Sequence, residues 1–98
     1  MEQLLKPLSI IRINSEEIAI SAIIFLASDV DQLSRFITLT GIDPNSLRAF
    51  AQDPEFLIAV LDYFLHDEPL LVTFCARLSI NPHHVLIAHE KLATKMEN

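Results

Sequence analysis

Glycine and tryptophan are almost missing from this sequence, which holds one glycine, Gly41, and no tryptophan among its 98 residues. Tight turns between β-strands depend on glycine for backbone angles that other residues avoid. So little glycine argues against a turn-rich β-sandwich and favours helices joined by short connections. It also excludes a glycine-rich loop of the kind that cradles phosphate groups.

Cysteine and positive charge are also scarce. The single cysteine, Cys75, excludes a disulfide within the chain. Thirteen Asp and Glu residues outnumber seven Lys and Arg residues, which gives a formal net charge of −6. Because phosphate backbones and anionic lipid surfaces attract Lys and Arg, this balance disfavours both nucleic acid and membranes as partners.

The chain has no run of the roughly 18–20 apolar residues that a membrane-spanning helix needs. Lys6 and Pro7 interrupt the apolar stretch at residues 4–11, and no small-residue cleavage site of a signal peptide follows it. We therefore expect a cytoplasmic protein, with an N-terminal apolar segment at residues 1–14 and a single helical domain at residues 15–98. Hydrophobic residues make up 51% of the sequence, which predicts that some apolar surface stays exposed.

Six capping residues predict six helix starts. Each is an Asn or Asp whose side-chain oxygen can accept a backbone N–H in the first turn, and four of them are followed within two residues by a proline. The expected helices cover residues 15–27, 30–40, 44–51, 54–66, 68–78 and 82–95, and their caps are Asn14, Asp29, Asp43, Asp53, Asp67 and Asn81. We expect an all-α fold, an orthogonal bundle of five or six short helices.

A shift of 38 residues aligns the sequence with itself: residues 16–48 fall on residues 54–86 without a gap, with seven identities. The caps coincide, since Asp29 falls on Asp67 and Asp43 on Asn81. Any two capped amphipathic helix pairs would align to some degree, but shared caps together with shared polar positions favour an internal repeat. The bundle would then consist of two related three-helix halves, with the helices at 15–27 and 54–66 as the central pair.

Several short runs resemble those of a known family. They are Leu26-Ala27-Ser28-Asp29, Leu33-x-x-Phe36, and the stretches at residues 39–48, 53–62 and 67–75. Together they resemble a family of short alphaproteobacterial proteins described as a domain of unknown function, over residues 15–86. The resemblance implies an all-helical fold and a bacterial cytoplasmic setting. It implies no activity, ligand or functional residue.

The four histidines and the cysteine are the side chains best suited to metal binding or nucleophilic catalysis. A zinc site on one helix needs histidines four residues apart, whereas His84 and His89 are five apart and point in different directions. Cys75 falls on an apolar stripe, with Arg77 on another face, so we expect a small buried hydrophobe rather than a nucleophile. We predict no catalytic, cofactor-binding or metal-binding residue, no cofactor and no enzymatic activity.

Residues 36–48 have the spacing of a helix-turn-helix, with Gly41 at the turn and apolar residues at 37, 42 and 47. In a DNA-binding version the second helix supplies basic and amide side chains; here it would offer Asn45 and Arg48 before Asp53 and Glu55 follow. We therefore expect a protein-interaction module, an adaptor or regulator, that binds a protein partner or a second copy of itself as a homodimer. A DNA-binding helix-turn-helix regulator is the alternative.

The repeat also predicts a contact surface. The helix at 68–78 carries apolar residues at positions where the helix at 30–40 carries polar ones, and one isoleucine of the first helix falls on an aspartate of the fourth. We expect these residues to face outward and to be covered, either by the N-terminal segment or by a partner. The candidate partner contact consists of Ile24, Leu70, Val72 and Ala76.

Overall fold

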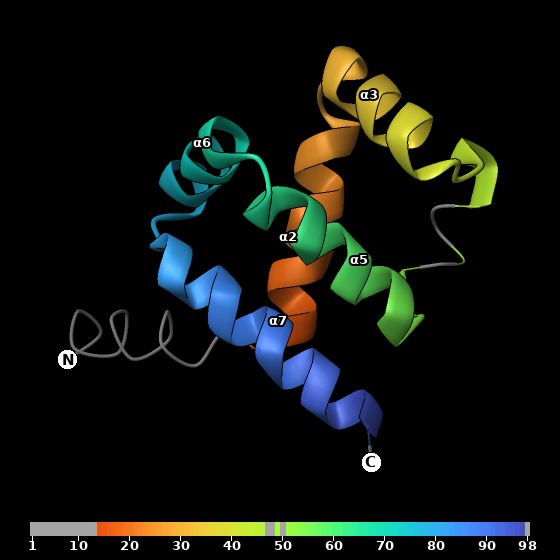
Figure 1. Ribbon diagram of the computed structural model, residues 1–98. Helices are drawn as coiled ribbons and strands as arrows, with labels where there is room; N and C mark the ends of the chain where they lie inside the picture. The colour runs from red at the N-terminus through yellow and green to blue at the C-terminus, as the bar shows by residue number, and fades with distance from the viewer. Residues whose placement is uncertain (1–13, 47–48, 50, 98) are drawn as a thin grey trace, which may run out of the picture.

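The computed structural model describes residues 14–46, 49 and 51–97, apart from the side chains of Pro44 and Glu97. In this part of the chain five α-helices and one 3-10 helix follow one another, and no strand occurs. They are α2 (Ser15–Ala27), α3 (Val30–Thr40), η1 (Pro44–Ser46), α5 (Pro54–Leu65), α6 (Glu68–Leu78) and α7 (Pro82–Glu97) (Figure 1). The predicted all-α class is confirmed.

The bounds of the five α-helices agree with the predicted ones to within two residues. The helix predicted at residues 44–51 is the exception. A 3-10 turn occupies Pro44–Ser46, and residues 47, 48 and 50 lie outside the described part of the chain. The predicted N-terminal segment at residues 1–14 also lies outside it, except for Asn14.

All six predicted capping side chains accept a backbone N–H at the start of the element that follows them. The Asn14 side-chain oxygen accepts from Glu17 at 2.8 Å, and the Asp53 carboxylate accepts from Glu55 at 3.0 Å. The six acceptors are Asn14, Asp29, Asp43, Asp53, Asp67 and Asn81. Because such a cap stabilises a helix by about 1 kcal/mol, signals within a few residues determine where these helices begin.

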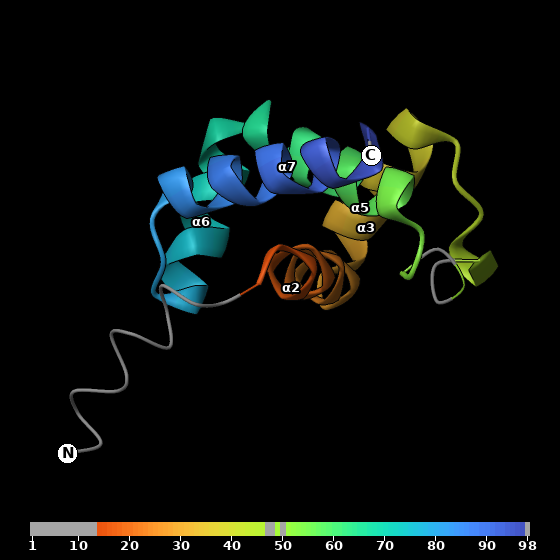
Figure 2. The same ribbon diagram turned by 90° about the horizontal axis from the view of Figure 1, so that it is seen from below.

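Three helices, α2, α5 and α7, form the centre of the molecule, and each packs against the other two. α5 and α7 run side by side in opposite directions (Figure 1). Figure 2 shows α2 end-on in a second layer beneath them. At the periphery, α3 packs against α2, and α6 packs against α5 and α7.

The third central helix, α7, was not part of the predicted central pair. Val85, Ala88 and Leu92 recur at helical spacing along α7, and all three are buried. This apolar stripe faces α2 and α5, so α7 contributes a third side to the core.

Aromatic rings connect the two helix pairs α2–α3 and α5–α6. Phe25 of α2 lies edge-on to Phe64 of α5 and to Phe74 of α6, with ring centres 6.1 and 5.5 Å apart. Phe36 of α3 lies edge-on to Tyr63 of α5 at 5.0 Å. Such contacts add to the burial of each ring and fix how the pairs pack on each other.

The two helix pairs also share local backbone geometry. Asp29 and Asp67 have φ angles of −134° and −133°, and Gly41 and Ser79 both adopt left-handed backbone, with φ of 75° and 59°. A shift of 38 residues also carries the buried residues of α2 onto buried residues of α5: Ile18, Ala19, Ala22 and Leu26 fall on Phe56, Leu57, Val60 and Phe64. These matches support the internal repeat, while superposition of the two complete units stays a prediction.

Among the described helices, no single one is long and apolar enough to cross a membrane. Only α6 and α7 taken together reach that length and composition, and they are bent by 99° where they meet. The orthogonal arrangement of the bundle stays a prediction.

Candidate functional site

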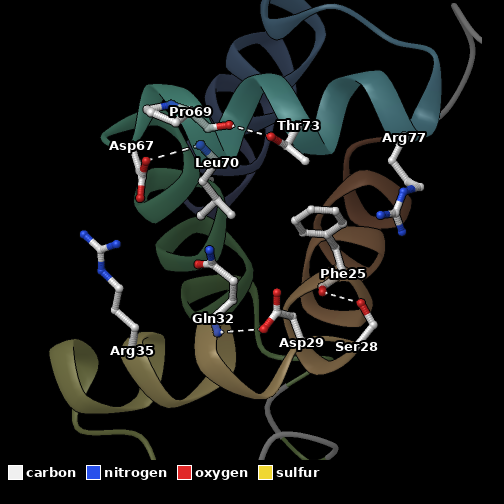
Figure 3. A pocket seen from close by; sticks show the side chains of 10 residues that line it. All are labelled: Phe25, Ser28, Asp29, Gln32, Arg35, Asp67, Pro69, Leu70, Thr73 and Arg77. Atoms are coloured by element: carbon white, nitrogen blue, oxygen red, sulfur yellow. Dashed lines mark hydrogen bonds between the residues drawn. The ribbon is translucent and has the colours of Figure 1, made fainter.

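A cleft of about 680 Å³ lies where the starts of α3 and α6 meet the end of α2 (Figure 3). We call it the cap cleft. Its lining residues are Phe25, Ser28, Asp29, Gln32 and Arg35 from one helix pair and Asp67, Pro69, Leu70, Thr73 and Arg77 from the other. Since Asp29 matches Asp67 in the repeat, and Gln32 matches Leu70, the cap cleft lies between equivalent parts of the two pairs.

The two carboxylates of the cap cleft are held by their own helices. Asp29 Oδ1 accepts the backbone N–H of Asp31 at 3.0 Å and of Gln32 at 3.3 Å. Asp67 Oδ1 accepts the backbone N–H of Leu70 at 3.2 Å. Negative charge at a helix start is also favourable against the helix dipole. Both carboxylates therefore serve the fold as helix caps.

Two arginines stand at opposite ends of the cap cleft, as Figure 3 shows. The Arg77 guanidinium lies 5.4 Å from the centre of the Phe25 ring, a distance at which the cation is attracted to the ring face. Arg77 is thereby tied to α2. Arg35, at the other end, also lines a second cleft.

This second cleft, of about 670 Å³, continues from the first past Arg35, Asp67 and Pro69, which line both. We call it the α3–α5 groove, because α3 forms one wall and α5 with the start of α6 forms the other. Its other lining residues are Leu39, Thr40, Ala59, Asp62, Tyr63, His66 and Glu68. Gln32 Oε1 and Tyr63 Oη are buried without a hydrogen-bond partner, so one residue of each cleft has an unsatisfied polar atom.

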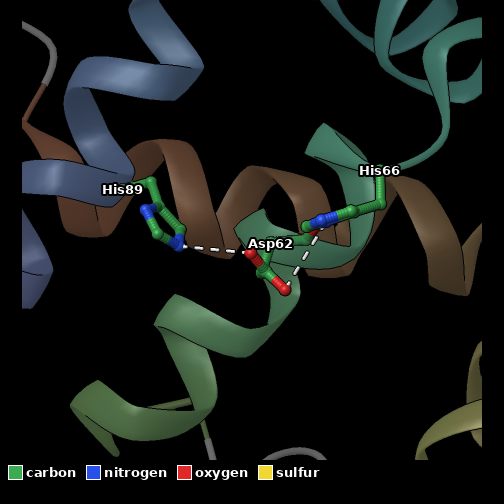
Figure 4. Close-up of polar contacts among 3 residues, drawn as sticks. All are labelled: Asp62, His66 and His89. Atoms are coloured by element: carbon green, nitrogen blue, oxygen red, sulfur yellow. Dashed lines mark hydrogen bonds and ion pairs between the residues drawn. The ribbon is translucent and has the colours of Figure 1, made fainter.

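Asp62 of α5 lies between two histidine rings (Figure 4). His66 Nδ1 donates to the Asp62 carbonyl oxygen at 2.8 Å and lies 3.6 Å from Asp62 Oδ2. His89 Nε2 of α7 lies 3.5 Å from Asp62 Oδ1. No group of three or more side chains in the described part of the chain is arranged to hold a metal ion. The three residues form a polar link between α5 and α7, which the sequence did not reveal because a whole helix separates Asp62 from His89.

Cys75 is buried, as predicted. Burial raises the pKa of the Cys75 thiol above its ordinary value, and a protonated thiol is a poor nucleophile. His84 has a structural role, because its Nδ1 accepts the backbone N–H of Asn81 at 3.1 Å. The neighbouring His83 is exposed.

Three of the four predicted contact residues are exposed: Ile24 at 63%, Val72 at 52%, and Ala76. The prediction was wrong for Leu70, which is only 5% exposed and belongs to the core. Its counterpart in the repeat, Gln32, is itself half-buried and lines the same cleft. Although Gln32 is polar, it lies between the two helix pairs and does not face solvent fully, so its polarity did not show that Leu70 is exposed.

A family model described as Protein of unknown function (DUF3572) matches residues 12–95. The chain belongs to this family. The match confirms the resemblance to a family of unknown function, while the alphaproteobacterial setting stays a prediction. No curated protein and no solved structure matches the chain. Because the family description assigns no activity, the function of this DUF3572 protein has to be inferred from its exposed residues and clefts.

Proposed function

We propose that this protein is a small, non-enzymatic protein-interaction module, an adaptor or regulator, and that the outward face of α2 is part of its contact surface. One observation carries the proposal. Ile24 is 63% exposed, and Ile20, one helical turn earlier, is 38% exposed. Full burial of one such side chain contributes roughly 1.5–3 kcal/mol, so a partner that covered both would gain a substantial part of its binding free energy.

The side of α2 that faces the core is also apolar, so the exposed isoleucines are not the residues that pack this helix against the core. Ala19 and Ala22 are fully buried against the other central helices. The helix therefore carries apolar residues both toward the core and toward solvent, which is unusual for a surface helix that has only the core to pack against.

Two further residues extend the proposed contact to α6. Val72 and Ala76 are exposed and one turn apart. The Phe74 ring of α6 packs against Phe25 of α2 at 5.5 Å, and Val72 and Ala76, two residues to either side of Phe74, lie on the outward side of α6. We keep Ile24, Val72 and Ala76 as the candidate contact, with a protein partner or a second copy of the chain as its occupant. The cytoplasmic setting that the sequence predicts is part of the same proposal.

The non-enzymatic part of the proposal is supported by how the polar groups are used. The Asp29 and Asp67 carboxylates in the cap cleft accept backbone N–H groups, and the Cys75 thiol is buried with a raised pKa. The DNA-binding alternative stays a prediction. Its second helix begins as the 3-10 turn Pro44–Ser46, and Arg48 lies outside the described residues.

A site-specific cross-link tests the proposal. A photoreactive amino acid is placed at position 24 in cells that naturally make the protein, and a matched one at position 34, where Ser34 is exposed on α3. We expect a covalent adduct with one defined protein, or with a second copy, from position 24 only. The adduct is identified by mass spectrometry and its binding is measured with purified proteins.

The same interaction must depend on the isoleucine side chain. Ile24→Ser is expected to weaken binding of the identified protein about tenfold with an unchanged thermal midpoint, because the side chain is exposed. Adducts of equal yield from positions 24 and 34, or unchanged affinity in Ile24→Ser, would contradict the proposed surface.

A further inference from the structure

The α3–α5 groove is a second exposed surface, separate from the outward face of α2. Leu39 of α3 is 65% exposed at one wall. Across the groove lie the exposed Ala59 and the half-buried Tyr63 of α5. The Tyr63 ring is held by edge-on contacts with Phe36 and Phe64, at 5.0 and 6.2 Å between ring centres. The groove therefore has a firm apolar floor and an apolar rim, both accessible to a ligand.

The charge around this apolar floor is predominantly negative. Asp62, Asp67 and Glu68 line the groove, against a single arginine, Arg35. Two helices also end at it, α3 at Thr40 and α5 at Leu65, and α6 begins at it, at Glu68. A helix C-terminus carries about half a negative charge, and an N-terminus carries about half a positive charge. The three carboxylates and the two C-termini outweigh Arg35 and the start of α6, so the groove favours a cationic ligand.

We propose that the α3–α5 groove binds a short amphipathic segment of another protein, one that places an apolar side chain against Leu39 and Tyr63 and basic side chains near Asp62 and Glu68. The apolar floor supplies contact area, and the carboxylates select a basic segment over an acidic one. A second copy of this chain fits less well, because each copy carries a net charge of −6 and like charges repel.

The probe for this proposal is a synthetic helical peptide of leucine and lysine, about 14 residues long so that it spans nearly four turns. Its leucines recur every three or four residues. A second peptide carries glutamate in place of every lysine. Binding to the isotope-labelled protein is followed by nuclear magnetic resonance. We expect the lysine peptide to shift signals of residues 35–40 and 59–69, and the glutamate peptide to leave them unchanged.

Three variants separate the groove from general attraction to an acidic protein. Leu39→Ser is expected to weaken the lysine peptide about tenfold, as the loss of one buried leucine contact would. Asp62→Asn combined with Glu68→Gln is expected to weaken it about threefold or more. The matched control combines Glu17→Gln with Glu90→Gln, which removes the same charge from exposed positions outside the groove and is expected to change affinity much less.

Arg35→Gln gives the sharpest test, because it should tighten binding by removing the one arginine that repels a basic segment. Several outcomes would overturn the proposal. The lysine peptide could fail to bind, or it could shift signals outside the groove. The control variant could weaken binding as much as the groove variants do, or Arg35→Gln could fail to tighten it. Concentration-dependent shifts of the groove signals in the free protein would identify a second copy as the occupant and would also overturn it.

Discussion

Asn81 and His84 hold the start of α7 reciprocally. The Asn81 side-chain oxygen accepts the backbone N–H of His84 at 3.2 Å, and His84 Nδ1 accepts the backbone N–H of Asn81 at 3.1 Å. This is the arrangement of a capping box, with a histidine ring at the position where glutamate or glutamine is usual. Since a backbone N–H can only donate, Nδ1 must be unprotonated for this bond to form.

Replacing the ring at position 84 should therefore destabilise the fold through α7. We expect His84→Ala to lower the free energy of unfolding by about 0.5–1 kcal/mol, because one N–H at the helix start loses its acceptor. His84→Glu should retain most of the stability, since glutamate can accept the same bond. Urea denaturation measures both, with His83→Ala as the control at an exposed neighbouring position. Equal stability of all three variants would show that the ring does not cap α7.

The Cys75 thiol makes stability depend on pH at the alkaline end. Burial raises the pKa of Cys75 in the folded state above its ordinary value, near 9.0. The unfolded chain therefore releases this proton first. The contribution is fully present below the ordinary value and is lost as pH rises from it toward the raised pKa.

A comparison with Cys75→Ala isolates this effect, because the other titrating groups are common to both proteins. We expect the difference in unfolding free energy, parent minus variant, to begin to fall as the pH reaches the ordinary pKa, near 9.0, and to go on falling above it. A thiol reagent should also react slowly with the folded protein and completely in denaturant. Rapid labelling of the folded protein would contradict the buried position of the side chain.

The left-handed residues that end α3 and α6 offer a matched pair of substitutions. Ser79 has a φ of 59°, a conformation that strains a residue with a side chain. Ser79→Gly should raise the free energy of unfolding by roughly 0.5–1 kcal/mol. Gly41→Ser should lower it by about 1 kcal/mol, for backbone reasons alone, because no atom lies within 4 Å of where its Cβ would be. If calorimetry shows that both substitutions change the free energy of unfolding in the same direction, this account is refuted.

Leu70 and Val72 should respond very differently to truncation, although the repeat assigns both to one surface. Leu70 is buried in the core, so Leu70→Ala should lower the free energy of unfolding by about 2–4 kcal/mol. Val72 is 52% exposed, and Val72→Ala should change it by about 0.5 kcal/mol or less. Guanidinium denaturation of the two variants at low protein concentration makes the comparison. Equal losses would mean that α6 is packed in another orientation.

Much of the fold could be read from the sequence because its signals are local. Each predicted cap acts on N–H groups two or three residues away, so Asn14 and Asp53 could be assigned without knowing what the helices pack against. The repeat also relates positions far apart in the chain, since it pairs Gly41 with Ser79, and both adopt left-handed backbone. It failed at Leu70, because a match between sequences does not say which neighbour each helix meets.

The sequence by itself determined the helical class, the helix starts and the burial of residues such as Cys75, all of which depend on neighbours along the chain and on apolar periodicity. Only the tertiary structure decided that α7 completes the core, that Leu70 lies between the helix pairs, and that Asp62 meets His89. The candidate α3–α5 groove belongs to this second group. The groove forms because α3 packs on α2, while α5 and the start of α6 form the facing wall. The direction in which one helix crosses another is set by side-chain packing over the whole interface.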